Sequence, residues 1–168
     1  AVENDNFHKL LLTFAEDIRV IIIMIVDRQN LMRTINHHPN QKFVENIANE
    51  SRYLYAPLAH RLGLFAIKTE LEDLSFKYEH PAAYQRISDQ IRESELHRTE
   101  IYKEFSTPIK AKLKELGLKY EAKARMKSVY SIWNKMEKKH VPFEEIYDIY
   151  AMRIIFECDD PSQEKVTC

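Results

Sequence analysis

Apolar residues recur at intervals of three and four along most of the first 116 residues, which is the spacing that places them on one face of an α-helix. One stripe consists of Leu54, Leu58 and Leu62, and a second consists of Leu71, Leu74 and Tyr78. We interpret both stripes as buried faces of packed helices and not as a cofactor-binding surface. The pattern predicts helices over residues 5–16, 18–36, 42–62, 64–78 and 81–117.

Prolines predict irregularities within two of these helices. Pro57 predicts a disturbance inside residues 42–62, because proline has no backbone N–H to donate within a helix. Thr107 precedes Pro108, and the residue before a proline disfavours the helical conformation. The long helix over residues 81–117 is therefore expected to kink or break at Thr107.

From Leu118 onward the pattern changes to strand, helix, strand. Residues 118–124 predict a short strand, and the apolar run at 149–156 predicts a second one. The predicted fold class is mainly α with a C-terminal α/β part. We expect the boundary between the helical and the α/β part to lie within residues 80–117, carried by the long helix.

The helix between the two strands carries a polar stripe. Lys127, Ser131 and Lys135 are four residues apart and therefore share one helix face. Arg125 lies where the first strand ends, and Asp148 closes the turn before the second strand. Magnesium takes few protein carboxylates and shares itself with phosphate oxygens, while Lys and Arg neutralise the remaining charge. The pattern indicates a site for a magnesium-bound triphosphate.

Each of these residues also has an ordinary interpretation, since helix lysines are usually solvated and an Asp before a strand is often a turn residue. The local charge distribution favours a site. Residues 110–139 contain ten Lys or Arg against three Glu, whereas residues 140–165 contain seven Asp or Glu against two basic residues. The whole chain is nearly neutral, with a net charge of −1 and a pI near 6.7, which does not indicate general adhesion to nucleic acid.

Glycine is scarce, and this limits how phosphate could be bound. The two glycines, Gly63 and Gly117, stand where helix C-terminal caps are expected. The sequence contains neither a dinucleotide-binding G-x-G-x-x-G nor a P-loop. Phosphate groups must therefore be held by side chains.

Three segments of the chain resemble the long RelA/SpoT family, whose members make and hydrolyse the alarmone (p)ppGpp. They are YAPLAHRLGLFAIKTELEDLSF, ARMKSVYSIWNKM and PFEEIYDIYAMRI, in the order of the family, and the resemblance runs from about Asp17 to Phe156. It implies the C-terminal part of an HD-type hydrolase domain at residues 1–80 and a linking helical region at 81–117. It further implies the start of a synthetase domain with a nucleotidyltransferase-like mixed sheet at 118–168.

The resemblance assigns roles in the synthetase site. The family reaction moves the β,γ-pyrophosphate of ATP to the 3′-hydroxyl of GDP or GTP, with Mg²⁺ as cofactor. The family's adenine-stacking arginines, phosphate-binding residues and magnesium-binding catalytic aspartate correspond to Arg125 and Arg153, to Lys127, Ser131 and Lys135, and to Asp148. Ala124 departs from the family, which commonly has Gly there. The second acidic ligand and the guanine-binding loop of the family lie beyond Cys168, so we expect this chain alone to be inactive in pyrophosphate transfer.

The resemblance also covers part of the hydrolase site. Asp27 corresponds to a manganese ligand, and Thr34 to a residue that approaches the nucleotide. Leu31 replaces the Asn that normally contacts the guanosine end, and Asn30 stands one position early, which turns a helical side chain by roughly 100°. The family's His and His-Asp metal ligands have no counterpart in this sequence. We therefore expect no hydrolysis by this chain alone, although a longer parent protein could use Mn²⁺ in this way.

Two interpretations from other classes remain open. One is a nucleic-acid-binding module built from residues 110–139, with Tyr120, Tyr130 and Trp133 as stacking platforms. The other is a catalytically silent scaffold that docks to other domains.

Composition predicts a cytoplasmic protein without a membrane partner. The longest apolar run, at residues 20–26, is far shorter than the roughly 20 residues that span a bilayer. The two cysteines, Cys158 and Cys168, provide no disulfide framework and fit a reducing cytosol. In the resembling family, ribosome and tRNA contacts belong to C-terminal domains that this sequence does not contain.

Overall fold

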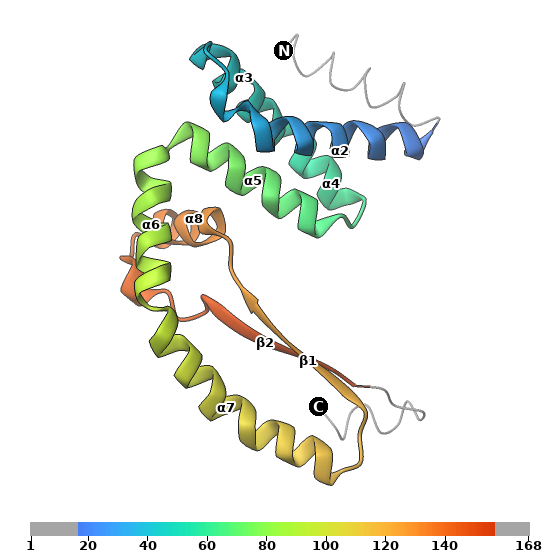
Figure 1. The fold of residues 1–168 in the computed structure, drawn as a ribbon, viewed down its shortest axis with the longest axis vertical. Coiled ribbons are helices and arrows are strands. Elements are labelled where there is room, and N and C mark those ends of the chain that lie inside the picture. The colour runs from blue at the N-terminus through green and yellow to red at the C-terminus, as the bar shows by residue number, and fades with distance from the viewer. Residues whose placement is uncertain (1–16, 157–168) are drawn as a thin grey trace. The chain divides into compact units, whose positions relative to one another are not determined.

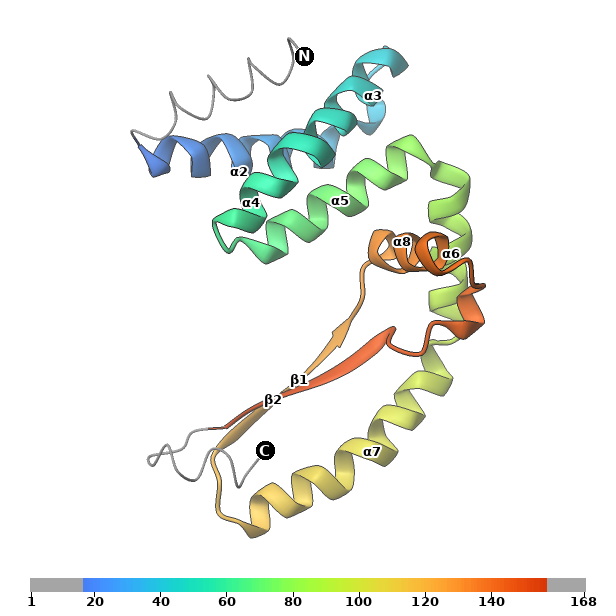
Figure 2. The same ribbon diagram turned by 180° about the vertical axis from the view of Figure 1, so that it is seen from behind.

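The computed structural model describes residues 17–156, and the chain divides between Gln85 and Arg86 into two compact units. Each unit is described by itself. The elements of the first unit are helical, as Figures 1 and 2 show. They are α2 (Ile18–Thr34), a 3₁₀ turn (Ile35–His37), α3 (Gln41–Glu50), a π-helical segment (Ser51–Tyr55), α4 (Ala56–Arg61), α5 (Phe65–Glu79) and the start of α6 (Pro81–Glu93).

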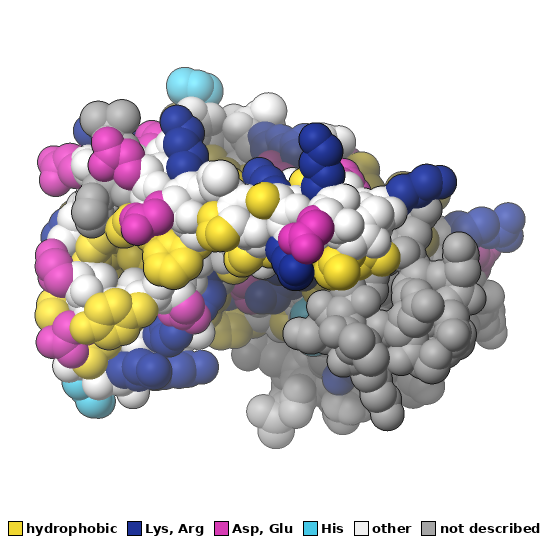
Figure 3. Space-filling model, turned by 90° about the horizontal axis from the view of Figure 1, so that it is seen from below, with side chains coloured by type: hydrophobic (Ala, Val, Ile, Leu, Met, Phe, Trp, Pro, Cys, Tyr) yellow, Lys and Arg dark blue, Asp and Glu magenta, His cyan; other side chains and the backbone are white. Residues whose placement is uncertain are grey.

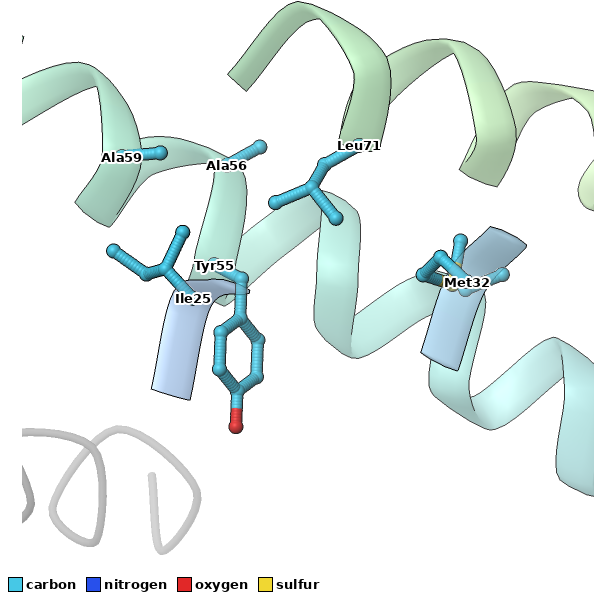
Figure 4. Close-up of a cluster of buried hydrophobic side chains, with 7 residues drawn as sticks. Ile25, Met32, Tyr55, Ala56, Ala59 and Leu71 are labelled. Atoms are coloured by element: carbon cyan, nitrogen blue, oxygen red, sulfur yellow. The ribbon is translucent and has the colours of Figure 1, made fainter. Parts of the chain in front are cut away.

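The first unit encloses a core between α2, α4 and α5 (Figure 4). Ile25, Met32, Ala56 and Leu71 are fully buried there. The two predicted apolar stripes pack against this cluster, because Leu54, Leu58, Leu62, Leu74 and Tyr78 are its partly buried neighbours. The interpretation of these stripes as core faces is confirmed.

Polar contacts join α2 to α5 beside that core. The Tyr78 hydroxyl donates to the Met32 carbonyl oxygen at 2.8 Å. Arg33 and Gln29 both donate to the Glu70 carboxylate, at 2.5 Å and 2.6 Å. These bonds lower the pKa of Glu70, chiefly through Arg33. Each bond joins a residue of α2 to a residue of α5, more than thirty positions away in the sequence. The three bonds therefore fix how the two helices are aligned.

The predicted disturbance near Pro57 is present and takes the form of the π-helical segment. The Ala56 N–H donates to the Ser51 carbonyl oxygen, five residues back. Pro57 then occupies the first turn of α4. The backbone N–H groups of a first turn make no hydrogen bond within the helix, so a proline is tolerated there. The irregular turn therefore precedes the proline, and the helical direction continues beyond it.

The second unit contains helices and a two-stranded sheet. Its elements are the end of α6, α7 (Glu95–Glu115), β1 (Tyr120–Met126), α8 (Val129–Lys139), a 3₁₀ turn (Phe143–Glu145) and β2 (Tyr150–Phe156). The predicted order of strand, helix and strand is confirmed. Within the described residues, β1 and β2 form an antiparallel pair, and the mixed sheet implied by the resemblance stays a prediction.

The predicted long helix over residues 81–117 is two helices. They separate at Ser94, whose hydroxyl donates to the Gln90 carbonyl oxygen at 2.6 Å and so competes with the helical hydrogen bonds. Of the kink or break expected at Thr107, the break is wrong, because α7 continues through Pro108, and the kink stays a prediction. The Thr107 hydroxyl donates to the Lys103 carbonyl oxygen at 2.6 Å, which gives this turn a hydrogen bond next to the one that the proline cannot make.

Both glycines have the predicted capping role. Gly63 follows α4 with φ +74°, and Gly117 follows α7 with φ +68°. This left-handed conformation is strained for a residue with a Cβ atom and is common just after a helix. The two turns therefore depend on glycine through their backbone, since a Cβ atom at either position would meet no neighbour within 4 Å.

Helix α7 contacts β2 of the sheet at Tyr150. Tyr102 on α7 meets Tyr150 on β2 edge to face, with ring centroids 5.7 Å apart. The neighbouring stripe of Ile101, Phe105 and Ile109 is exposed. In the view from below (Figure 3), hydrophobic side chains lie between basic and acidic ones on the visible surface.

None of the helices within residues 17–156 combines the length and the apolar composition needed to cross a membrane.

Candidate functional site

The main chain brings Lys127 next to the turn that precedes β2. The last strand pair in the register is Met126 with Tyr150. One further hydrogen bond follows it, from the Lys127 N–H to the Ile149 carbonyl oxygen at 2.9 Å. Lys127 and Asp148 are therefore adjacent across the end of the sheet, although 21 positions separate them in the sequence.

Helix α8 starts immediately after Lys127 and is capped by Ser128. The Ser128 hydroxyl oxygen accepts from the Ser131 N–H at 3.2 Å, and the two hydroxyl oxygens lie 3.0 Å apart. This is the usual N-cap arrangement, in which a side chain satisfies a free N–H of the first turn. Sequence reasoning missed Ser128, although a serine directly before an apolar helical run is a recognised signal.

Three of the predicted site residues converge in a cluster that we call the Lys–Asp–Lys clamp, formed by Lys127, Asp148 and Lys135. Lys127 Nζ forms an ion pair with Asp148 Oδ2, and Lys135 Nζ lies 2.5 Å from Asp148 Oδ1. The three side chains are 36%, 49% and 28% exposed in that order, so the clamp is open to solvent and to ligands. Ser131 and Lys135 are four positions apart on α8 and share one of its faces, but Lys127 precedes the helix, because the backbone is still extended at the N-cap Ser128. The predicted helical stripe is therefore wrong for Lys127, which reaches Asp148 from the end of the sheet.

The clamp strongly favours the ionised form of its carboxylate. The pKa of Asp148 falls from its ordinary value of 3.8 to about 2, first through the hydrogen bond from Lys127 and then through that from Lys135. Two ammonium groups that bond to the charged form stabilise it against protonation. The site therefore contains an ionised carboxylate at neutral pH, bonded to two lysine side chains.

The two predicted adenine-stacking arginines lie on one face of the sheet. Arg125 is paired with Ala151, and Lys123 with Arg153. Opposite residues in an antiparallel pair point to the same face, and diagonal neighbours are within reach of long side chains. Arg125 and Arg153 are such diagonal neighbours, and both are exposed. Tyr150, which contacts α7, belongs to the other face, and the described residues of the arginine face are exposed.

The chemistry of this donor set fits a magnesium ion that is shared with phosphate groups. Asp148 offers an exposed carboxylate, and Mg²⁺ characteristically takes one or two carboxylates together with phosphate oxygens. Within residues 17–156, no three His, Cys, Asp or Glu side chains gather as a metal cluster.

The two predicted hydrolase residues lie on α2, in the first unit. Asp27 and Thr34 are exposed and seven positions apart, which places them on one helix face two turns from each other. The Thr34 hydroxyl donates to carbonyl oxygens of its own helix, those of Asn30 and Leu31, at 3.2 Å. The described residues thus supply one carboxylate of the predicted manganese site, and the roles of Asp27 and Thr34 stay predictions.

Comparison with known proteins connects both parts of the chain to one family. Residues 1–65 match the family model described as an HD domain, and residues 124–167 match the model described as a region found in RelA/SpoT proteins. The chain belongs to the RelA/SpoT family. The second match includes the arginine face and the whole clamp. The roles of the individual residues in that family stay predictions for this chain.

Curated relatives match the RelA/SpoT chain over most of its length. It is 42% identical over 151 residues to a GTP pyrophosphokinase of Myxococcus xanthus, covering 90% of this chain and 20% of that protein. It is 39% identical to a GTP pyrophosphokinase of Escherichia coli K12, and this match covers 91% of this chain and 20% of that protein. It is 40% identical to a guanosine-3′,5′-bis(diphosphate) 3′-pyrophosphohydrolase of Vibrio cholerae, and this match covers 93% of this chain and 22% of that protein. The chain spans about a fifth of the length of these relatives.

The two family matches leave the middle of the chain uncovered. The HD match ends at residue 65, and the RelA/SpoT match begins at residue 124. Residues 66–123 lie between them and contain α5 except Phe65, all of α6 and α7, and the first part of β1. The domain limits at residues 80 and 117 stay predictions.

Proposed function

We propose that this chain supplies the ATP-binding half of a (p)ppGpp synthetase site, which transfers the β,γ-pyrophosphate of ATP to the 3′-hydroxyl of GDP or GTP. The observation that carries the proposal is the convergence of Lys127 and Lys135 on Asp148, with Ser131 on the same face of α8 as Lys135. Relatives named GTP pyrophosphokinase support the reaction class.

In this proposal the triphosphate of ATP takes the place of the carboxylate as the partner of the two lysines. Lys127 and Lys135 neutralise the phosphate charge, and the Ser131 hydroxyl donates to a phosphate oxygen. Ser128 positions Ser131 through the N-cap hydrogen bonds. Phosphoryl and pyrophosphoryl transfer depend mainly on positioning and on charge stabilisation, and cationic side chains provide both.

Arg125 and Arg153 hold the adenine ring between their guanidinium groups. Their placement on one open face of the sheet supports this role. A guanidinium plane stacks well on an aromatic base. Lys123 on the same face is paired with Glu121 at 3.0 Å and takes no part in the proposed adenine site.

Asp148 would hold the magnesium ion. When bound, the ion supplies positive charge to the phosphate oxygens as negative charge develops on them. The carboxylate is ionised, exposed and next to the phosphate-binding lysines, which supports the assignment. Asp148 also keeps the two lysines in place before the nucleotide enters.

We further propose that a longer protein containing this chain hydrolyses (p)ppGpp through its HD domain, with Mn²⁺ as cofactor. The HD match over residues 1–65 and a relative named 3′-pyrophosphohydrolase support this second activity. Asp27 and Thr34 are its candidate residues in the described part of the chain. Contacts with ribosomes and tRNA would use other regions of such a protein.

The test incubates a longer protein that carries this chain with GDP and with ATP labelled at the β-phosphate. We expect the label on the 3′ position of the guanosine product. The Asp148→Asn variant should lose the product, and the Lys139→Met variant should keep it. Equal product from the Asp148→Asn variant would contradict the proposal. The 168-residue chain alone is expected to give no transfer.

A further inference from the structure

Both oxygens of the Asp148 carboxylate are engaged by ammonium groups. Lys127 Nζ pairs with Oδ2, and Lys135 Nζ pairs with Oδ1 at 2.5 Å. A cation that coordinates this carboxylate must displace at least one ammonium group or lie very close to one. The carboxylate that is best placed for magnesium is therefore also the partner of two fixed positive charges.

The backbone holds the two lysines on opposite sides of Asp148. Lys127 is fixed by its N–H to the Ile149 carbonyl oxygen, at 2.9 Å. Lys135 is held two turns into α8, whose first turn is capped by Ser128. The clamp is therefore built from the sheet end, the helix and the turn before β2. It can lose its ion pairs by side-chain rotation without any change in the fold.

The surroundings of the clamp are positively charged. The arginine face adds Arg125 and Arg153 on the neighbouring strands. Lys123 is on this face as well and is offset by Glu121. A free dication approaching Asp148 meets an excess of positive charge, and like charges at short range raise the cost of binding. A metal–triphosphate complex has a net negative charge, so the same positive side chains attract it.

We propose that the Lys–Asp–Lys clamp makes the metal site conditional on the triphosphate, so that Asp148 takes magnesium only as part of a metal–nucleotide complex and excludes the free ion. This inference rests on the proposed ATP-binding function of the same residues. The triphosphate attracts Lys127 and Lys135 and releases the carboxylate for the metal. Because linkage is reciprocal, the metal must in turn strengthen the binding of the triphosphate by the same factor.

The inference predicts opposite effects of one substitution on two ligands. Replacing Lys135 by methionine removes a competitor of the metal and a partner of the phosphates. Lys135→Met should therefore strengthen the binding of the free ion and weaken the binding of the nucleotide complex. A lysine with only a general electrostatic role would change the two affinities far less, as expected for Lys139→Met further along α8.

The test uses the 168-residue chain labelled with ¹⁵N and follows paramagnetic broadening of its amide signals by Mn²⁺, in place of Mg²⁺. The second ligand is α,β-methylene-ATP, which cannot transfer its β,γ-pyrophosphate. With Mn²⁺ alone, we expect no selective broadening at the amides of Lys127, Asp148 and Ile149. With the analogue present, these amides should broaden at Mn²⁺ concentrations at least about tenfold lower, a difference of about 1.4 kcal/mol in coupling.

The outcomes separate this inference from the proposed function. Selective broadening by Mn²⁺ alone, at concentrations like those needed with the analogue, would overturn the inference and leave ATP binding intact. Binding of the free ion that Lys135→Met leaves unchanged, measured by the same broadening, would overturn it as well. If the analogue does not bind to the chain with or without Mn²⁺, both the inference and the proposed function are wrong.

Discussion

Lys135 Nζ lies 2.5 Å from Asp148 Oδ1, although the two residues are 13 positions apart in the sequence. Lys135 belongs to α8, and Asp148 belongs to the turn that leads into β2. The contact joins a helix to the end of a sheet and, together with Lys127, forms a preorganised set of alternating charges. The geometry of this set depends on the register of β1 with β2, since that register places Lys127 beside the same turn.

Asp148 is expected to stay ionised at all but very acidic pH. Its folded pKa of about 2 lies below the ordinary value of 3.8, so its ion pairs stabilise the folded chain above pH 3.8 and are lost as the pH falls through about 2. A ¹³C NMR titration of the Asp148 carboxyl group should give a midpoint near 2. The midpoint should rise in Lys127→Met, and a wild-type midpoint near 3.8 would show that the clamp is not formed.

Arg125 and Arg153 are expected to distinguish ATP from a bare polyphosphate chain. Replacing Arg153 by alanine should weaken the binding of the ATP analogue by about 1 kcal/mol, the scale of one cation–π contact, because the adenine loses a stacking partner. The binding of tripolyphosphate should change far less. Calorimetric titration of both ligands with magnesium measures the difference.

The matched control for Arg153 is Lys123, which is directly opposite it in the register. Lys123→Ala removes a positive charge from the same face but no proposed base contact. If Lys123→Ala and Arg153→Ala weaken ATP binding equally, the arginine face attracts nucleotides only through its charge. The adenine assignment would then be wrong.

The ion pair between Arg52 and Glu79 should matter for the stability of the first unit. The two side chains are only 15% and 11% exposed, and Arg52 Nη1 lies 2.5 Å from Glu79 Oε2. Arg52→Met leaves the Glu79 carboxylate mostly buried without this cation, which should cost about 3 kcal/mol. Urea unfolding followed by circular dichroism measures the loss. Arg19→Met, which removes the exposed partner of Asp17, should change the same measurement little.

The core of the first unit makes a second stability prediction. Leu71 on α5 is fully buried in the cluster shown in Figure 4, whereas Phe65 on the same helix is 58% exposed. Leu71→Ala should therefore lower the free energy of unfolding by about 2–5 kcal/mol through lost burial and a cavity. Phe65→Ala should cost much less. Similar losses for both variants would show that the cluster is not the main core of this unit.

The order of elements could be predicted from the sequence, but one helix boundary could not. The change from a period of three or four residues to a strand pattern after Gly117 located β1, α8 and β2. The break at Ser94 had no comparable signal, because it depends on a serine hydroxyl that bonds to its own backbone. Pro108 gave a stronger signal, yet α7 continues through it, since one lost hydrogen bond does not end a long helix.

The residues of the candidate site could be proposed from the sequence, but the contacts between them could not. Helix spacing predicted one face for Lys127, Ser131 and Lys135, of which Lys127 lies before α8. The strand pattern added Arg125 and Asp148, and the resemblance added Arg153. The sequence did not show that both lysines bond to Asp148, because this depends on the strand register and on the path of residues 140–149. Neither spacing nor resemblance indicated that the proposed metal-binding carboxylate of Asp148 is paired with both lysines.

The central claim is that the clamp lysines bind the triphosphate of ATP, and calorimetric titration of the chain with magnesium and α,β-methylene-ATP tests it most directly. The account predicts that Lys127→Met and Lys135→Met each weaken binding at least about tenfold, or about 1.4 kcal/mol, while Lys139→Met on the same helix changes it little. Equal losses for all three variants would contradict the account and would favour a general basic surface for nucleic acid.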